Sequence, residues 1–236
     1  MKRLFAIIAT CMLSVGFLTA QNSMATADFQ NISVRHAIEV KLVPSDHYEI
    51  VFPSDLSWLE GLKTTDMYTV KAGTLKLAFP ESFIKRTNRN LNNQNKRQKE
   101  PIVIYFKDLK SLSLSGASEA KSEKEITASQ FNVKLSGASE AKLHITADKL
   151  ETRLSGASEL DLFGTVKNHI LELSGASELD AENLNVQETD IHIFGASEAN
   201  IMSQKVTGKA SGASDVKVKA VECSIKTSGA SSVKRK

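Results

Sequence analysis

The sequence contains little cysteine, with two residues among 236. Cys11 lies within an N-terminal apolar run that we expect to be removed, which leaves Cys223 as the only cysteine of the exported chain. An intrachain disulfide is therefore excluded from that chain, and Cys223 is predicted to be a small buried core residue. A second long apolar run is also missing, so the mature chain is not expected to span a membrane.

The sequence also lacks an excess of either charge. Its 30 Lys and Arg residues face 27 Asp and Glu residues, for a formal net charge of +3. Basic stripes with interleaved aromatic residues are absent, so no nucleic-acid partner is expected. Nucleophile-elbow, phosphate-loop and paired-cysteine motifs are absent as well. We therefore predict that the protein is not an enzyme, has no catalytic residues, and uses no cofactor or metal.

The first residues have the pattern of an export signal. Lys2 and Arg3 precede an apolar run over residues 4–20, which ends in the small residues Thr19 and Ala20. A basic start, a short apolar run and a small-residue cleavage site are typical of a secretory signal peptide. We predict a signal peptide over residues 1–20, followed by a single domain over residues 21–236.

The most informative feature is a repeated Leu-Ser-Gly-Ala-Ser-Glu-Ala segment, first found at residues 114–120. Its central glycine recurs at intervals of 17 to 21 residues, which gives seven copies. A near-constant period of this length indicates stacked structural repeats. The seven glycines are Gly116, Gly137, Gly156, Gly175, Gly195, Gly212 and Gly229.

Each repeat reads as two short strands joined by a Gly-Ala-Ser corner. Before one corner, Phe131, Val133 and Leu135 alternate with polar residues, and the alternation resumes after it. Such a period of two indicates strands with one buried face. Glycine allows the positive φ of a sharp corner, and Ala and Ser are small enough for corners to stack about 4.8 Å apart. The repeats therefore predict an all-β, single-stranded parallel β-helix with one coil per repeat.

The first half of the chain has a less regular strand pattern. We predict that residues 28–109 form irregular capping coils, ahead of the regular repeats over residues 110–236. Residues 81–100 interrupt the pattern with several Lys, Arg and Asn residues and are predicted to form a flexible basic loop. Two interpretations of this loop remain open: a solvated connection between strands, or a basic arm that binds anionic glycans or lipid headgroups.

Three features together resemble a known bacterial family. They are the repeated Ser-Gly-Ala-Ser-(Glu/Asp) corners, the lead-in Asp-Phe-Gln-Asn-Ile-Ser-Val at residues 28–34, and the Leu-Lys-Leu strand at residues 75–77. They resemble the "putative auto-transporter adhesin, head GIN domain" family, a domain of unknown function. The resemblance covers nearly the whole mature chain, and the corner is its specific part. It implies a right-handed parallel β-helix on an exported protein of Gram-negative bacteria, and it suggests adhesion or recognition.

Carboxylates recur at a fixed place in the repeat. Six follow the corner serine: Glu119, Glu140, Glu159, Glu178, Glu198 and Asp215. Two residues further along the same face, the middle repeats carry Asp161 and Asp180. If the coils stack in register, the candidate binding surface consists of Glu159, Asp161, Glu178, Asp180 and Glu198. This surface is either a weak divalent-cation site or a solvated face that resists lateral association.

These observations favour one function over two alternatives. We predict an exported, non-catalytic module of the bacterial envelope that binds a glycan or a protein, in the periplasm, at the outer-membrane surface or outside the cell. The first alternative is a structural or assembly protein, which could form homo-oligomers through its terminal coil. The second is a polysaccharide-active enzyme, which would need one carboxylate pair in distinct environments rather than a motif repeated in every coil.

Overall fold

The computed structural model describes residues 23–59, 61–87 and 100–236. The predicted signal peptide over residues 1–20 and most of the predicted basic loop, residues 88–99, lie outside the described part. Within the described residues, no helix is both long and apolar enough to cross a membrane.

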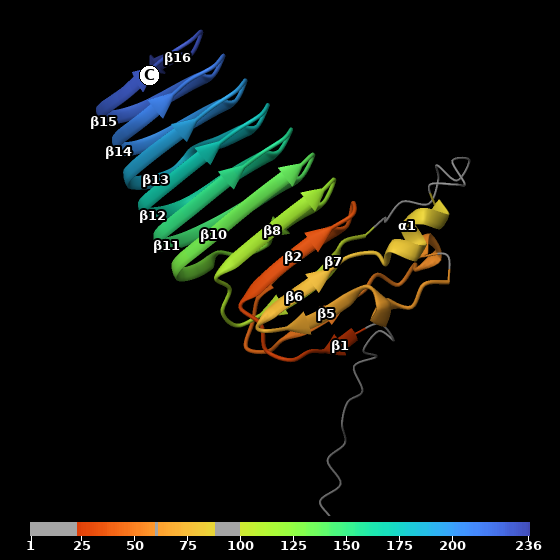
Figure 1. Ribbon diagram of the computed structural model, residues 1–236. Helices are drawn as coiled ribbons and strands as arrows, with labels where there is room; N and C mark the ends of the chain where they lie inside the picture. Colours follow the sequence, from red (N-terminus) through yellow and green to blue (C-terminus); the bar gives the residue numbers. More distant parts are fainter. Residues whose placement is uncertain (1–22, 60, 88–99) are drawn as a thin grey trace, which may run out of the picture.

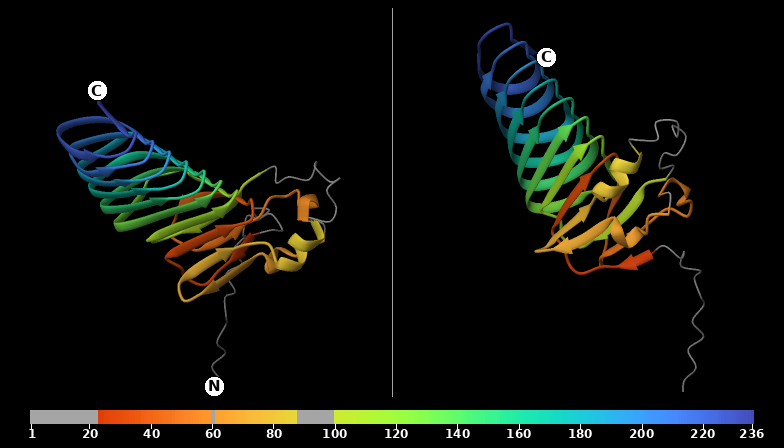
Figure 2. Two further views of the ribbon diagram at one scale, coloured as in Figure 1. Left: turned by 45° about the horizontal axis from the view of Figure 1, so that its top comes forward. Right: turned by 45° about the vertical axis from the view of Figure 1, so that its right-hand side comes forward.

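Seven strands in the second half of the chain stack side by side in parallel, each pairing with the next (Figure 1). They are β10 (Ile126–Gly137), β11 (Glu140–Leu154), β12 (Glu159–Leu173), β13 (Glu178–Ile193), β14 (Glu198–Ala210), β15 (Asp215–Thr227) and β16 (Ser232–Arg235). Figure 2 shows the coils following one another along a single axis, with the irregular part of the chain at one end. The predicted parallel β-helix is confirmed.

The division of each repeat into two short strands is wrong. A single strand runs from one corner to the next, as in β11, which contains 15 residues. This strand bends instead of ending: Ala147 and Lys149 pair with the next coil, whereas Asp148 between them does not. At the equivalent bend of β13, Gln187 and Glu188 both face outward, so the alternation of buried and exposed residues changes phase there. Backbone pairing on both sides keeps the bent segment in the sheet, which the sequence pattern alone does not reveal.

The corners explain why glycine recurs. All seven corner glycines have φ between 71° and 85°, a region that other residues rarely adopt. A Cβ added to Gly156 would lie 2.5 Å from the carbonyl oxygen of Gly137 in the preceding coil. That oxygen accepts a hydrogen bond from the Ala157 N–H at 2.7 Å. Glycine is therefore required both by the backbone conformation and by the close approach of the preceding coil.

A serine closes each of the seven corners, and it is buried in all but the last. Ser158, which is 1% exposed, donates its hydroxyl to the carbonyl of Ser155 at 2.6 Å. The same contact, between residues three apart, is made by Ser118, Ser139, Ser177, Ser197, Ser214 and Ser231. The hydroxyl satisfies a carbonyl that the sharp turn removes from the ladder, which matches the known use of serine in turns.

The first half contributes both stacked and antiparallel strands. The stacked parallel strands are β2 (Asn31–Arg35), β3 (Glu39–Pro44), β6 (Thr74–Leu77), β7 (Ile102–Phe106), β8 (Ser111–Gly116) and β9 (Glu119–Ser122). The antiparallel pairings involve β1 (Ser23–Ala25), β4 (Glu49–Val51) and β5 (Tyr68–Lys71), and two 3-10 turns lie at Ser57–Leu59 and Thr64–Asp66. The regular stack thus begins on an irregular base.

One further corner lies in this first half, and it lacks the repeated Ser-Gly-Ala-Ser segment. His36 and Ala37 have φ of 69° and 58° and join β2 to β3. A Cβ on Gly116 would meet the backbone nitrogen of His36 at 3.2 Å, so the two corners are stacked. Two non-glycine residues therefore adopt the conformation that glycine supplies in the later coils, at a cost of about 1–3 kcal/mol each.

The predicted basic loop begins with a helix, which corrects the prediction of a loop over residues 81–100. Helix α1 spans Glu81–Thr87, and the carbonyl of Pro80 accepts its first backbone hydrogen bonds. Phe83 is 8% exposed and stacks on Phe79, with ring centroids 5.0 Å apart. This buried aromatic contact favours a short helix of about two turns over a solvated loop. The charged residues around Phe83 obscure it in the sequence.

The buried side chains form one continuous apolar cluster along the stack. Outside this cluster, the buried polar residues include His169, which is 1% exposed and whose Nε2 lies 3.0 Å from the Thr152 hydroxyl. In the part of the chain that the structure describes, His169 Nδ1 and the Thr189 hydroxyl have no hydrogen-bond partner. Cys223 packs against the cluster but is half-buried, so its predicted full burial is wrong.

Candidate functional site

The carboxylates that follow the corners form a row along the stack. Each pairs in register with its equivalent in the next coil, because the corners hold every coil at the same starting point. The row runs through Glu119, Glu140, Glu159, Glu178, Glu198 and Asp215. Adjacent members are therefore one strand spacing apart, about 4.8 Å between backbones.

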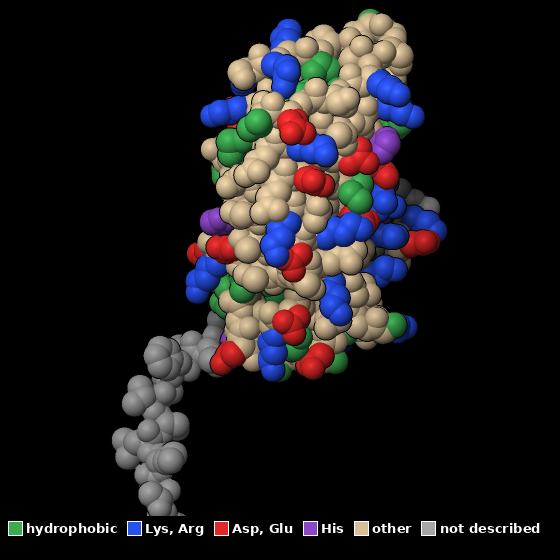
Figure 3. Space-filling view, turned by 90° about the vertical axis from the view of Figure 1, so that its left-hand side faces the viewer, with side chains coloured by type: hydrophobic (Ala, Val, Ile, Leu, Met, Phe, Trp, Pro, Cys, Tyr) green, Lys and Arg blue, Asp and Glu red, His purple; other side chains and the backbone are tan. Residues whose placement is uncertain are grey.

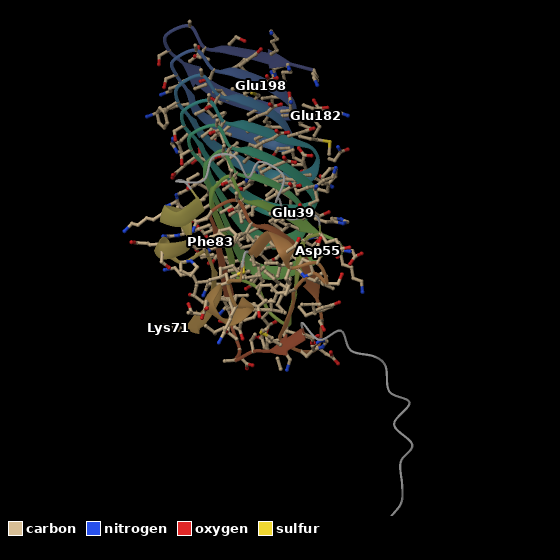
Figure 4. All side chains as sticks on the ribbon, turned by 90° about the vertical axis from the view of Figure 1, so that its right-hand side faces the viewer. Glu39, Asp55, Lys71, Phe83, Glu182 and Glu198 are labelled. Atoms are coloured by element: carbon tan, nitrogen blue, oxygen red, sulfur yellow. The ribbon has the colours of Figure 1, made fainter. Side chains whose placement is uncertain are left out.

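The structure adds Glu39 to the beginning of this row. Glu39 pairs in register with Glu119, and Glu39 and Glu198 lie along the same side of the stack (Figure 4). The sequence signal is weak: Glu39 follows the corner at His36 and Ala37, which contains no glycine. The spacing from Ala37 to Glu39 does match the spacing from Ala117 to Glu119, and this match is the one signal in the sequence that points to Glu39.

Lysines neutralise the ends of the row. At one end, Lys41, Lys121 and Lys142 each lie two residues after a carboxylate of the row. At the other end, Lys217 lies two residues after Asp215, and Lys234 is the register partner of Lys217 in β16. Four of them form ion pairs at these positions: Lys121 with Glu119, Lys142 with Asp161 at 3.8 Å, Lys217 with Glu198 at 2.6 Å, and Lys234 with Asp215 at 3.2 Å. Lys41 pairs instead with Glu123, outside the row, at 2.8 Å. Two members of the predicted binding surface, Asp161 and Glu198, are therefore paired with lysine.

The middle of the row keeps its negative charge. Among the described residues, Glu159, Glu178 and Asp180 take part in no ion pair, and Glu159 pairs in register with Glu178. Burial, and then the charges of Glu140 and Glu178, raise the pKa of Glu159 above its ordinary value. Like charges on successive coils disfavour each other's ionised form, so the middle of the row attracts protons or cations.

The row does not converge on a single point. Over the described residues, no group of three or more His, Cys, Asp or Glu side chains could hold a metal ion. The carboxylates are spread along the stack at one per coil, whereas a calcium site needs six to eight oxygens around one centre. The geometry therefore suits a row of separate contacts better than one chelating site.

A second polar surface, which the sequence reasoning missed, lies at the bends of the last four long coils. A shallow hollow of about 600 Å³ crosses β12, β13, β14 and β15, and we call it the bend groove. One column of its lining is in direct register and consists of Asn168, Glu188, Lys205 and Glu222; the other consists of Gln187, Gln204 and Val221. Figure 3 views the stack from the left-hand side of Figure 1 and shows acidic and basic side chains intermixed on that side. No repeated motif marks these positions, since their residue types differ from coil to coil.

The family is settled by a match along most of the chain. The family model described as "Putative auto-transporter adhesin, head GIN domain" matches residues 28–221. The chain belongs to this family. The matched region of this head GIN domain protein contains the full carboxylate row and all but the last residue of the bend groove.

Solved structures share the fold of this head GIN domain protein at low sequence identity. A putative adhesin from Bacteroides fragilis has a TM-score of 0.73 at 17% identity, with 91% of this chain and 95% of that chain covered. A "putative lipid binding protein" from Parabacteroides distasonis gives 0.65 at 18%, and a putative adhesin from Parabacteroides merdae gives 0.65 at 16%, both with the same coverage. No curated protein matches the chain. These likenesses extend to the fold and not to any particular residue.

Proposed function

We propose that this protein is an exported recognition module of the bacterial envelope, which binds a glycan or a protein ligand without catalysis. The adhesin family and the adhesin neighbours support this function. The observation that carries it is the in-register stack: every coil presents equivalent side chains at one spacing, on a frame of parallel strands. A rigid array of this kind reduces the conformational cost of binding an extended ligand.

The carboxylate row supports binding better than hydrolysis. A glycosidase needs a protonated acid beside an ionised partner at one point in a cleft. Glu159 has a raised pKa, but equivalent carboxylates flank it in both directions, and the bend groove does not include it. We therefore propose recognition rather than cleavage.

A binding assay on envelope material tests the proposed function. The chain without residues 1–20 is immobilised and exposed to outer-membrane and periplasmic fractions of a Bacteroides species, with or without protease or periodate treatment of the fraction. We expect the immobilised protein to retain a component of one fraction. Loss of retention after protease treatment indicates a protein ligand, and loss after periodate treatment indicates a glycan. If neither fraction is retained above an unrelated β-helix control, the recognition function is wrong.

An assembly role is the second candidate, and one observation favours it. Residues 219–227 of β15 pair with β14 on one side, whereas β16 covers only residues 215–218 on the other. Val221 in this stretch is 81% exposed. An unpaired strand edge beside exposed apolar surface is a template for another chain. Concentration-dependent self-association in analytical ultracentrifugation would support assembly, and a monomer up to high protein concentration would count against it.

A further inference from the structure

The bend groove is produced by a change in coil length. The interval from Gly175 to Gly195 is 20 residues, and the interval from Gly195 to Gly212 is 17. The pairing of β13 with β14 accordingly shifts register between Ala181 and Val186, where the longer coil bulges. We attribute the hollow to this step, because its lining residues come from the coils on both sides of the change in length.

The floor of the groove is held in place by a buried hydroxyl. Ser203, which is 6% exposed, lies 3.0 Å from the carbonyl of Lys205 and 3.4 Å from that of Gln187 in the preceding coil. This shared contact ties two successive bends together below the surface. The outward side chains at these bends are therefore presented from a fixed backbone, which is what a preformed binding site requires.

The polar side chains of the groove are not used by the fold. Glu188 and Lys205 are register partners, as are Lys205 and Glu222. No ion pair or hydrogen bond within the described ranges engages these three side chains, or the amides of Gln187 and Gln204. Nearer the base of the stack, in contrast, the same bend is closed by an ion pair of 2.6 Å between Lys167 and Asp148. The bend thus changes from a closed surface to one with available polar groups.

The chemistry of the lining restricts the ligand. Amides both donate and accept hydrogen bonds, carboxylates accept and an ammonium donates, so the groove complements a ligand whose groups do both. Hydroxyls of a sugar have this property, and the apolar Val221 at one end can pack against the C–H face of a sugar ring. Two carboxylates beside one lysine disfavour a polyanion, and a mostly polar lining disfavours an acyl chain.

We propose that the bend groove binds a linear, uncharged oligosaccharide segment laid along the stack across four coils. This inference rests on the proposed recognition function and assigns its ligand class and its binding surface. The bend groove, rather than the carboxylate row, is then the glycan-binding face of the molecule.

The test uses an array of neutral and acidic oligosaccharides of three to six residues, probed with the chain lacking residues 1–20. The groove variant is the double substitution Gln187→Ala with Gln204→Ala, and the matched control is Glu159→Gln with Glu178→Gln in the carboxylate row. Both pairs are outward-facing residues on successive coils, and circular dichroism melting verifies that both variants are folded. The best array hit is then titrated against all three proteins by calorimetry.

The groove variant is expected to raise the Kd of a neutral hit about tenfold or more, since each amide contributes one or two hydrogen bonds, and the control should stay within twofold. A second variant, Val221→Asp, should weaken binding of the same hit. Loss of binding in the row control alone, or hits restricted to acidic glycans, would overturn the inference but leave recognition intact. The inference would also be overturned, with recognition intact, if envelope fractions were retained but no glycan on the array bound. Binding to phosphatidylethanolamine vesicles in place of glycans would have the same meaning. Failure of both the array and the envelope assay would overturn the proposed function as well.

Discussion

His169, a buried histidine of β12, makes the stability of the stack dependent on pH. Burial lowers the pKa of His169 from 6.5 to about 4, because a charged imidazolium in an apolar interior is poorly solvated. Its partner, the Thr152 hydroxyl at 3.0 Å, does not compensate for a charge. The unfolded chain binds a proton near pH 6.5, whereas the folded chain resists it until about pH 4. Stability is therefore complete above pH 6.5 and falls as the pH drops between these two values.

The size of the effect follows from the shift. One pKa unit corresponds to about 1.4 kcal/mol, so a depression of roughly 2.5 units contributes about 3 kcal/mol to the free energy of unfolding. This contribution is present at pH 7.5, and most of it is lost on acidification to pH 4. For a domain with a total stability of about 5–15 kcal/mol, the loss is large.

Urea unfolding at pH 7.5, 5.5 and 4.0, followed by circular dichroism, measures this contribution. The control is His169→Leu, because the register partner of His169 in the preceding coil is Leu150, so leucine already occupies the equivalent position there. Carboxylates that titrate in the same range affect both proteins, so the difference between the two pH profiles isolates the histidine. If the difference in unfolding free energy between the two proteins is the same at all three pH values, the reasoning is refuted.

Three further results are expected. Gly156→Ala should lower the free energy of unfolding by about 2–5 kcal/mol in urea titrations, because it adds positive-φ strain and a contact with the preceding backbone. The control Gly73→Ala, with φ of 68° but open space around it, should cost only the strain of about 1–2 kcal/mol. Equal losses in the two variants would contradict the steric account. His36→Gly should raise the melting temperature, because strain released at φ 69° outweighs the added chain entropy; a lower melting temperature would mean that the imidazole makes a stabilising contact. Glu178→Gln should leave the melting temperature nearly unchanged and lower the pKa of Glu159 in an NMR titration, although burial, the larger cause, remains; an unmoved pKa would argue against coupling along the row.

The corners and the carboxylate row could be predicted because each is encoded locally and repeated. Gly156 and Glu159 are three residues apart, so one coil contains all the information needed, and the period supplies the stacking. The corner at His36 escaped because it lacks glycine, and its equivalence to Gly116 becomes visible only when β2 and β8 lie side by side. Helix α1 escaped because a single buried aromatic residue, Phe83, stabilises it within a strongly charged segment.

The bend groove could not be predicted for a different reason. It depends on the difference in length between neighbouring coils, which is a relation between two segments and not a property of either one. Its residues, such as Gln187, Lys205 and Val221, share no motif, so no pattern search would group them. Surface sites formed by an irregularity in a regular fold are therefore harder to predict from sequence than the regularity itself.

The close approach of one corner glycine to the next has a consequence for how such a chain changes over evolutionary time. Each coil meets its neighbour through the same backbone contact, with the carbonyl of one glycine lying against the next glycine, whichever coils are involved. Duplicating or deleting one whole repeat therefore recreates contacts that already exist and lengthens or shortens the molecule by about 4.8 Å. The length of the molecule can therefore change in discrete steps of one coil without any new kind of contact between coils.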